Sequence, residues 1–367
     1  MYYLQDLQNI IEINSYTKNK AGVDRVGEIF DSWLDDLGFN VEIHQRSHIG
    51  NHRHYKSQHI PNAKKLLLLG HLDTVFPEGK FEKYSEDKEW IYGPGVCDMK
   101  GGNIVALQAL RELKSEGISI KNIDILFVSD EETGSDDSKK LTATLAKDYD
   151  YCFVYEAAGE AMEVVTGRKG VGTFFIDIVG KAAHAGNSYT KGSDANLEAS
   201  YKLQELVKLT NLELGTTVNV GKMEGGIGAN TISPHAHLTF ELRYKSQLER
   251  DRVLKAIDTI VNTTYVEGTS STLSGGIQRD VMQTSSSSLA LIKSIENITG
   301  AELKSEERGG VSDANIVSSS GVVTLDGFGP FGDGDHTVHE RANKKSFVSR
   351  ISLSKKLMQH FIEKSDF

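Results

Sequence analysis

Three short apolar runs lie in the first half of the chain, and each leads directly into residues that can bind metal or transfer protons. Unbroken apolar runs of this length are typical of strands buried on both faces of a parallel sheet. In open sheets of this kind, functional residues gather beyond the carboxyl ends of the strands, so we expect these residues to share one edge. The runs and the residues that follow them are LLLLG (66–70) with His71 and Asp73, IDILFVSD (123–130) with Glu131 and Glu132, and DYCFVY (150–155) with Glu156.

Helical periodicity fills the segments between these runs. Apolar residues recur at helical spacing over 21–37 and again over 104–113, and Gly38 and Gly117 follow as candidate helix ends. Strands that alternate with helices predict an α/β domain whose mostly parallel sheet is covered by helices on both faces.

The pattern changes after about residue 168. Alternating segments such as HAHLTFELRY (235–244) replace the unbroken runs, and two further helices are expected among them. This arrangement has antiparallel character and predicts a smaller, inserted α+β domain, after which the α/β pattern resumes. The predicted division is a discontinuous larger domain at 1–167 and 284–367, and an inserted domain at 168–283.

Composition narrows the choice of function. A net charge of −10 over 367 residues argues against a general nucleic-acid binder, which normally carries a basic face. No apolar run approaches the roughly 20 residues that a membrane span needs, and the first residues lack the layout of a signal peptide. The two cysteines imply no disulfide framework. We therefore expect a cytoplasmic protein without nucleic-acid or membrane partners.

The polar residues at the expected sheet edge suit a metal centre. An imidazole with several carboxylates is a donor set for Zn²⁺, Mn²⁺ or Co²⁺. Asp98 joins the set because it stands just before Gly101–Gly102, where the second helix should begin. Two divalent ions carry +4 and the carboxylates of Asp98, Glu132 and Glu156 carry −3, so a bridging hydroxide would neutralise a site with two ions.

The residues alone leave several assignments open. Of the neighbours Glu131 and Glu132, one can bind metal while the other transfers protons. Asp73 could accept the second N–H of His71 and fix its tautomer. GDGDHTVHE (332–340) offers two histidines, His336 and His339, with no means of choosing between them. Ordinary structural roles also remain open, such as a solvated acidic loop for the two glutamates or a helix N-cap for Asp98.

A second stretch, HQRSHIGNHRHYKSQH (44–59), contains five histidines. Its basic residues Arg46, Arg53 and Lys56 would repel a cation, and the stretch falls between two expected strands. We therefore interpret it as a solvated hairpin rather than as a metal site.

Taken in order, the motifs resemble the dizinc metallopeptidase family of glutamate carboxypeptidases, aminoacylases and succinyl-diaminopimelate desuccinylases, and most of all its bacterial glutamate carboxypeptidases. The resemblance extends along nearly the whole chain, and the ordered set is far more specific than any one motif. The motifs are GHLDTV (70–75), YGPGVCDMKGG (92–102), DEETGS (130–135), VYEAAGE (154–160), GKAAHAG (180–186) and a late His-x-x-x-Glu.

The resemblance implies a role for each residue of the expected centre. It implies two zinc ions, with cobalt or manganese as alternatives, and a cis peptide bond between Asp98 and Met99. Glu131 would be the general base and acid. In the family the late ligand precedes a glutamate by four residues, as His336 precedes Glu340. The implied ligands are Asp98 as the bridge, His71 and Glu156 on one ion, and Glu132 and His336 on the other.

The resemblance also implies that the inserted domain is a lid and dimerisation domain. His184 would stabilise the oxyanion, often in the site of the partner subunit of a homodimer. Arg243 would bind the α-carboxylate of the substrate, although Glu241 lies two residues away and could form a surface ion pair with it. Asn230, which could instead only shape a turn, and Gly309–Gly310 fall in segments that bind substrate.

The implied activity is hydrolysis of the amide bond of a peptide or N-acyl amino acid that carries a free carboxylate. Two alternatives stay open within the same family, a cytosolic dipeptidase and an N-acyl-amino-acid deacylase. A non-catalytic binding relative is a third, which the apparently complete ligand set disfavours.

Overall fold

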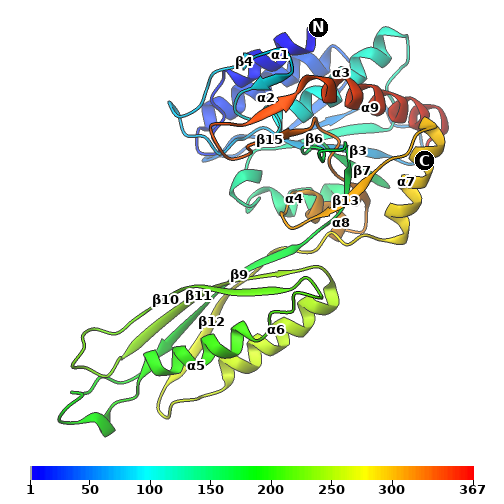
Figure 1. Ribbon diagram of the computed structural model, residues 1–367. Helices are drawn as coiled ribbons and strands as arrows, with labels where there is room; N and C mark the ends of the chain where they lie inside the picture. Colours follow the sequence, from blue (N-terminus) through cyan, green and yellow to red (C-terminus); the bar gives the residue numbers. More distant parts are fainter. Residues whose placement is uncertain (1) are drawn as a thin grey trace. The chain divides into compact units, whose positions relative to one another are not determined.

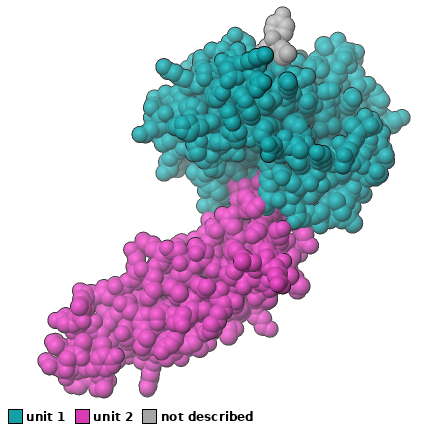
Figure 2. All heavy atoms as spheres, in the orientation of Figure 1, with its two compact units in different colours: residues 1–167, 284–308, 312–367 teal, residues 168–283, 309–311 magenta. Residues whose placement is uncertain are grey.

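The computed structural model describes residues 2–367, and the chain divides into two compact units (Figures 1 and 2). Unit 1 contains residues 2–167, Thr284–Arg308 and Ser312–Phe367, and unit 2 contains Arg168–Gln283 and Gly309–Val311. Gly309–Val311 thus groups with unit 2 although its sequence neighbours on both sides belong to unit 1. None of the helices within 2–367 is long and apolar enough to cross a membrane.

Unit 1 is an α/β domain built on a six-stranded sheet. Four strands are parallel, as the unbroken apolar runs predict, and two antiparallel strands extend one edge. In spatial order the strands are β1 (Asn40–His44), β2 (His52–Lys56), β6 (Ile123–Val128), β3 (Leu66–His71), β7 (Tyr151–Val154) and β14 (Val323–Leu325).

Helices cover both faces of this sheet, and the larger group of helices shares one hydrophobic core with it. In Figure 1 one group of helices lies above the sheet of unit 1, and α4 and α8 lie below it. The helices of unit 1 are α1 (Tyr2–Ile11), α2 (Lys20–Asp35), α3 (Lys100–Ser115), α4 (Ser138–Ala146), α7 (Ser286–Thr299), α8 (Ala314–Ser319) and α9 (Lys344–Lys364).

The start of α3 packs unusually close to the end of β7. A Cβ atom on Gly102 would lie 1.8 Å from the carbonyl oxygen of Tyr155, and one on Gly101 would lie 2.0 Å from that of Val96. Only glycine permits this approach. The two glycines therefore bring the residues that precede α3 next to the carboxyl edge of the sheet.

Two small sheets also belong to this architecture. One joins β15 (Gly332–Asp333), β16 (Arg341–Asn343), β5 (Trp90–Tyr92) and β4 (Ser85–Glu86) in that order. The other pairs β8 (Val164–Arg168) with β13 (Ser305–Arg308). The pairing of β16 with β5 places the GDGDHTVHE segment beside the segment that leads into α3.

Unit 2 is an α+β domain with a four-stranded antiparallel sheet. Residues of β11 alternate between buried and partly exposed, as the sequence predicts, and the buried ones form a second hydrophobic core with α5 and α6. In spatial order the strands are β10 (Thr217–Gly225), β11 (His235–Tyr244), β9 (Gly170–Val179) and β12 (Ser270–Arg279), and the helices are α5 (Ala195–Val207) and α6 (Gln247–Asn262).

The interpretation of the histidine-rich stretch as a solvated hairpin is only half right. The stretch does form the hairpin of β1 and β2, but four of the five residues of β2 are buried. The Nε atom of Arg53 donates to Asp31 Oδ1 at 3.1 Å, so this charge is paired rather than solvated. The interpretation fails because β2 lies inside the sheet, between β1 and β6, and its acidic partners come from distant parts of the chain.

Candidate metal centre

His71 is the last residue of β3, and its side chain is only 1% exposed. Its Nδ1 lies 3.0 Å from the carbonyl oxygen of Asp73, which fixes the ring and directs Nε2 outward. Nε2 lies 3.1 Å from Asp98 Oδ1 and 3.8 Å from Glu156 Oε1. The side-chain amide of Asn103 donates to the carbonyl oxygen of His71 at 2.7 Å and holds the strand end in place.

The carboxylate of Asp73 is farther from this imidazole, at 3.4 Å, than the sequence interpretation supposed. It accepts the backbone N–H groups of Glu131 at 3.3 Å and Glu132 at 3.2 Å, and the hydroxyl of Thr17 at 2.7 Å. Asp73 is completely buried, so these bonds satisfy a carboxylate that water does not reach. Its side chain therefore positions the acidic loop after β6 more directly than it orients His71.

Asp98 lies between two histidines, and the Asp98–Met99 peptide bond is cis, as the resemblance implies. Oδ1 lies 3.1 Å from His71 Nε2, and Oδ2 lies 3.1 Å from His336 Nε2. Burial raises the pKa of Asp98, but the two imidazoles together hold that pKa well below its usual range. A carboxylate with one oxygen directed at each of two separate imidazoles has the arrangement that a bridging ligand requires.

Two further carboxylates face the same point. Glu132, in the 3₁₀ helix η1 (Glu131–Thr133), places Oε2 3.1 Å from His336 Nε2. Burial, together with the charge of Asp98, raises the pKa of Glu132 to about 8 and raises that of Glu156 well above its usual value. Buried acids this close to one another are unfavourable unless a cation compensates them.

His336 adopts a left-handed backbone conformation, with φ of 61°, and reaches Asp98 and Glu132 from a side chain that is 59% exposed. Hydrogen bonds with these two carboxylates raise the pKa of His336 to about 11. His339 is exposed, and its backbone N–H donates to the hydroxyl of Thr337 at 3.2 Å. The structure therefore brings His336 to the other predicted residues.

Glu340 has a role that its spacing alone did not reveal. Its buried carboxylate accepts the backbone N–H groups of Gly95 at 2.9 Å, Cys97 at 3.0 Å and Asp98 at 3.1 Å. Burial, with the charge of Asp98 next, raises the pKa of Glu340 to about 7 despite these bonds. Glu340 thus fixes the loop that carries Asp98. Because His336 precedes Glu340 by four residues, the same bonds also hold the segment of His336 beside this loop.

The donor set fits a divalent metal centre with two ions. One ligand atom from each of His71, Asp98 and Glu132 lies within 4.8 Å of the other two. Two imidazoles and several buried carboxylates are the ligand types that Zn²⁺, Mn²⁺ and Co²⁺ take in proteins. The excess of buried negative charge is what two divalent cations would compensate.

The remaining predicted residues lie in unit 2. His184 and Asn230 are exposed and belong to paired segments, because the N–H of Ala185 donates to the carbonyl oxygen of Asn230 at 2.9 Å. The Nδ1 atom of His184 accepts the backbone N–H groups of Gly186 and Asn187, both at 3.2 Å. Their roles toward the residues of unit 1 stay predictions.

Arg243 and Gly309 meet within unit 2. Nη1 of Arg243 donates to the carbonyl oxygen of Gly309 at 3.0 Å, and Nε donates to Glu241 Oε1 at 2.7 Å. The neighbouring carbonyl oxygen of Gly310 accepts a hydrogen bond from Arg168 at 3.3 Å. The ion pair that the sequence left open as an alternative is therefore present, and Arg243 also contacts a segment predicted to bind substrate.

Comparison with known proteins identifies relatives of the whole arrangement. The sequence model of peptidase family M20/M25/M40 matches residues 67–360. Carboxypeptidase G2 from Pseudomonas sp. is 30% identical over 261 residues, which cover 70% of this chain and 63% of that protein. Acetylornithine deacetylase from Edwardsiella ictaluri is 27% identical over 254 residues, which cover 64% of this chain and 65% of that protein. The chain thus spans somewhat less than two thirds of the length of these two relatives.

The fold is also that of a solved peptidase structure. The crystal structure of a tripeptidase from Staphylococcus aureus matches with a TM-score of 0.83 at 23% sequence identity. The match covers 99% of this chain and 98% of that one. Both units therefore belong to one known fold.

Proposed function

The chain belongs to peptidase family M20/M25/M40, and from this premise we propose that it is a metal-dependent hydrolase of amide bonds. Its substrate in this proposal is a peptide or N-acyl amino acid with a free carboxylate, as the names of the carboxypeptidase and tripeptidase relatives suggest. The observation that supports the proposal most strongly is Asp98, whose two carboxylate oxygens lie at equal distances of 3.1 Å from two different histidines.

The proposed ligand set divides five side chains between two ions. Such ions, zinc in the first instance and cobalt or manganese as alternatives, would polarise the scissile carbonyl and lower the pKa of bound water to roughly 7. The surrounding protein supplies rigidity, since Asp73 and Glu340 hold two of the loops through backbone N–H groups. The ligands are Asp98 as the bridge, His71 and Glu156 on one side, and Glu132 and His336 on the other.

Glu131 is the proposed general base and acid. It is the first residue of η1, next to the proposed ligand Glu132, and Asp73 binds the backbone N–H groups of both. The carboxylate of Glu131 would take a proton from the attacking water and hold it until the leaving amine needs it. A rigid backbone on either side lets two adjacent glutamates serve different functions.

Unit 2 is proposed to act in binding substrate and in pairing two subunits. Arg243 would bind the substrate carboxylate, since a guanidinium offers two parallel donors to that group. Asn230, Gly309 and Gly310 would line the same binding region, and His184 would stabilise the oxyanion, in the site of the partner subunit where the protein is a homodimer. Partner and substrate both rest on the family relationship rather than on contacts within this chain.

A substrate panel tests the proposal. The metal-stripped protein, reloaded with Zn²⁺, Co²⁺ or Mn²⁺, is assayed on glutamate-terminated acyl compounds, dipeptides, tripeptides and the same compounds with an amidated carboxyl end. Metal-dependent hydrolysis that is slower with the amidated compounds, by about the factor that loss of Arg243 would cost, is expected. Absence of amide hydrolysis with every metal would refute the proposal.

An N-acyl-amino-acid deacylase is the second candidate. The similarity to acetylornithine deacetylase, which extends over 64% of this chain, favours it. N-acetylated amino acids in the same panel separate the two functions, because they carry a small acyl group in place of a second residue. Preference for them by more than tenfold in kcat/KM would favour the deacylase.

A further inference from the structure

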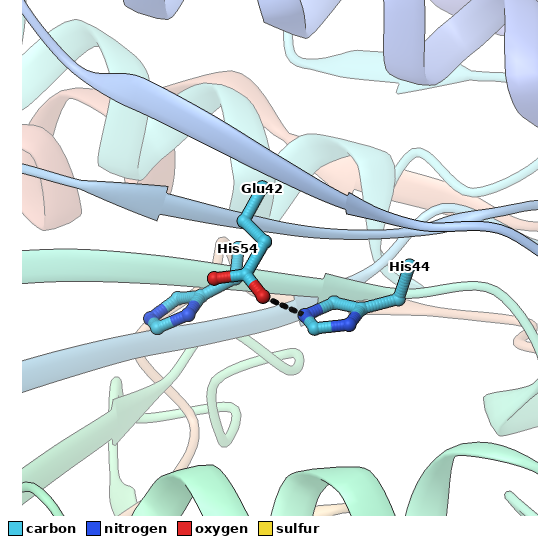
Figure 3. A group of neighbouring side chains, drawn as sticks. All are labelled: Glu42, His44 and His54. Carbon is cyan, nitrogen blue, oxygen red and sulfur yellow. Dashed lines mark ion pairs between the residues drawn. The ribbon is translucent and has the colours of Figure 1, made fainter.

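A second group of possible metal ligands lies on the β1–β2 hairpin of unit 1, away from the residues of the candidate metal centre. Glu42 of β1 is directly opposite His54 of β2, and His44 follows Glu42 by two residues, on the same face of the strand. One ligand atom from each of the three lies within 4.8 Å of the other two. Figure 3 draws the carboxylate of Glu42 between the two imidazole rings.

The hydrogen bonds of His54 fix which of its nitrogens is available. His54 is 3% exposed, and its Nε2 lies 2.7 Å from the hydroxyl oxygen of Tyr149. That hydroxyl donates its only proton to Asp124 Oδ2 at 2.7 Å, so Nε2 of His54 must be the N–H donor to the tyrosine oxygen. Nδ1 then carries a lone pair, and it has no hydrogen-bond partner among residues 2–367.

Hydrogen bonds link the imidazole of His54 through Tyr149 to the carboxylate of Asp124, and this arrangement is one that supports metal-binding histidines. A ligating histidine normally donates its other ring N–H to an oxygen acceptor, which fixes the tautomer and makes the ligating nitrogen more basic. Asp124 is itself secured, because it also accepts the backbone N–H of Ser57 at 2.8 Å and lies 2.7 Å from His59 Nε2. A buried imidazole is thus held ready to donate a lone pair to a cation.

His44, on β1, is the second imidazole of the group with an unpaired ring nitrogen among the described residues. Its Nε2 is buried without a hydrogen-bond partner in the part of the chain that the structure describes, and it lies 3.9 Å from Glu42 Oε1. Burial lowers the pKa of His44 and lowers that of His54 to about 4, so both rings are neutral near pH 7, as metal ligands must be. Lys56 binds the other oxygen of Glu42, Oε2, at 2.6 Å and leaves Oε1 toward His44.

The three basic residues that argued against a cation here are all paired with acidic side chains. Arg53 is a neighbour of His54, so its side chain leaves the opposite face of β2, where it pairs with Asp31. Arg46 pairs with Asp137. Of the three basic side chains, that of Lys56 contacts the group directly, and its charge is paired with Glu42. The charge of Arg46 also acts on His44, although Asp137 pairs with it.

We propose that Glu42, His44 and His54 bind one divalent transition-metal ion of the zinc type. Two imidazoles and a carboxylate are a known three-ligand set for Zn²⁺, and a fourth position remains for water or another ligand. With metal–ligand bonds of about 2.0–2.2 Å, tetrahedral ligand atoms lie roughly 3.3–3.6 Å apart, so the three side chains must close by on the order of 1 Å. The half-exposed side chain of Glu42 can rotate to do this.

A bound ion would join the outermost strand of the sheet to its neighbour. β1 is one of the two edge strands and pairs only with β2 in the described sheet, and four of its five residues are exposed. A ligand that binds only the folded hairpin stabilises it by mass action, in proportion to the free ion concentration. The ion would therefore secure an exposed edge of the sheet.

Ion counting on the full-length protein tests the proposal. The metal-free protein is dialysed to equilibrium against excess Zn²⁺, and bound zinc is measured for the wild type, His44→Gln and Glu42→Gln. Both variants should bind one ion fewer per chain than the wild type. The comparison between chains cancels whatever the candidate metal centre contains, so the outcome does not depend on the proposed function.

His48→Gln is the matched control, because His48 is exposed in the connection of the same hairpin. It should bind as many ions as the wild type. Unfolding temperatures in a chelator should be equal for all four chains, which shows that the variants fold. If His44→Gln unfolds early, Glu42→Gln decides, since its side chain is 51% exposed. An unchanged ion count in the folded variants, or an equal loss with His48→Gln, overturns the proposal.

Discussion

The two units hold their predicted functional residues in different ways. In unit 1 these residues are mostly buried, and carboxylates from distant segments fix their backbones, as Glu340 does for the loop of Asp98. In unit 2, His184 and Asn230 are exposed, and Arg243 binds its neighbour Glu241. Desolvating several acids is unfavourable. The difference indicates that the residues of unit 1 are held rigidly in place, whereas the exposed residues of unit 2 are held less tightly.

The largest effect is expected for a change at Glu131, and it tests whether the proposed hydrolysis takes place in unit 1. Glu131→Gln removes the proposed proton acceptor but keeps the size of the side chain, so kcat should fall by roughly 10²- to 10⁴-fold. The number of bound ions, measured as above, should not change. Asp136→Asn, an exposed acid in the same loop, is the control and should retain full activity. Substantial turnover by Glu131→Gln would place the chemistry elsewhere.

The second prediction separates the two late histidines. His336→Ala should lose one ion from the candidate centre and reduce kcat/KM by on the order of 10²-fold, because metal sites are sensitive even to loss of their outer-sphere partners. His339→Ala, three residues away and exposed, should keep both ions and full activity. The reverse result would mean that the loop binds metal in another conformation.

The third prediction concerns the residues that hold the site rather than those at its centre. Glu340→Gln retains one acceptor oxygen for three backbone N–H groups and loses the charge, so metal affinity should fall by roughly 10- to 100-fold. Asp333→Asn, in the same segment but paired with Arg341 at the surface, is the comparison. Equal metal affinity in the two variants would show that the loop of Asp98 holds its shape without Glu340.

The smallest effect is expected in unit 2. Arg243→Ala should raise KM for substrates with a free carboxylate by about 10-fold, since a hydrogen bond to a charged group contributes roughly 1.5–3 kcal/mol. The effect on kcat should be small, and amidated analogues should be unaffected. A loss of equal size on amidated analogues would mean that Arg243 acts only through Glu241 and Gly309 inside unit 2.

The sequence predicted the elements of unit 1 well because parallel strands leave a clear signal. Unbroken apolar runs located β3, β6 and β7, and the rule that functional residues follow such strands located His71, Glu132 and Glu156. Asp98 and His336 follow no long strand. Short strands and close glycine contacts bring them to the same place, and local patterns encode these only weakly.

Contacts between distant segments account for what the sequence left open. The residues alone could not choose between His336 and His339, since the choice depends on a left-handed turn beside a loop that begins about 240 positions earlier. The sequence did not predict the burial of β2, because histidine, arginine and lysine are typical of solvated segments. Its partners, Asp31 and Asp137, come from a helix and from a loop in other parts of unit 1.

The two ends of the inserted segment lie side by side. Arg168 and Met282 exchange two backbone hydrogen bonds, of 2.8 and 3.1 Å, and the hydroxyl groups of Thr166 and Thr284 lie 3.2 Å apart. The chain thus leaves unit 1 and returns to it at nearly the same point. A genetic deletion or exchange of the intervening stretch would need only a short joining turn and no rerouting of the larger fold. Insertion of a domain as a cassette is a plain route by which one hydrolytic scaffold could acquire new substrates.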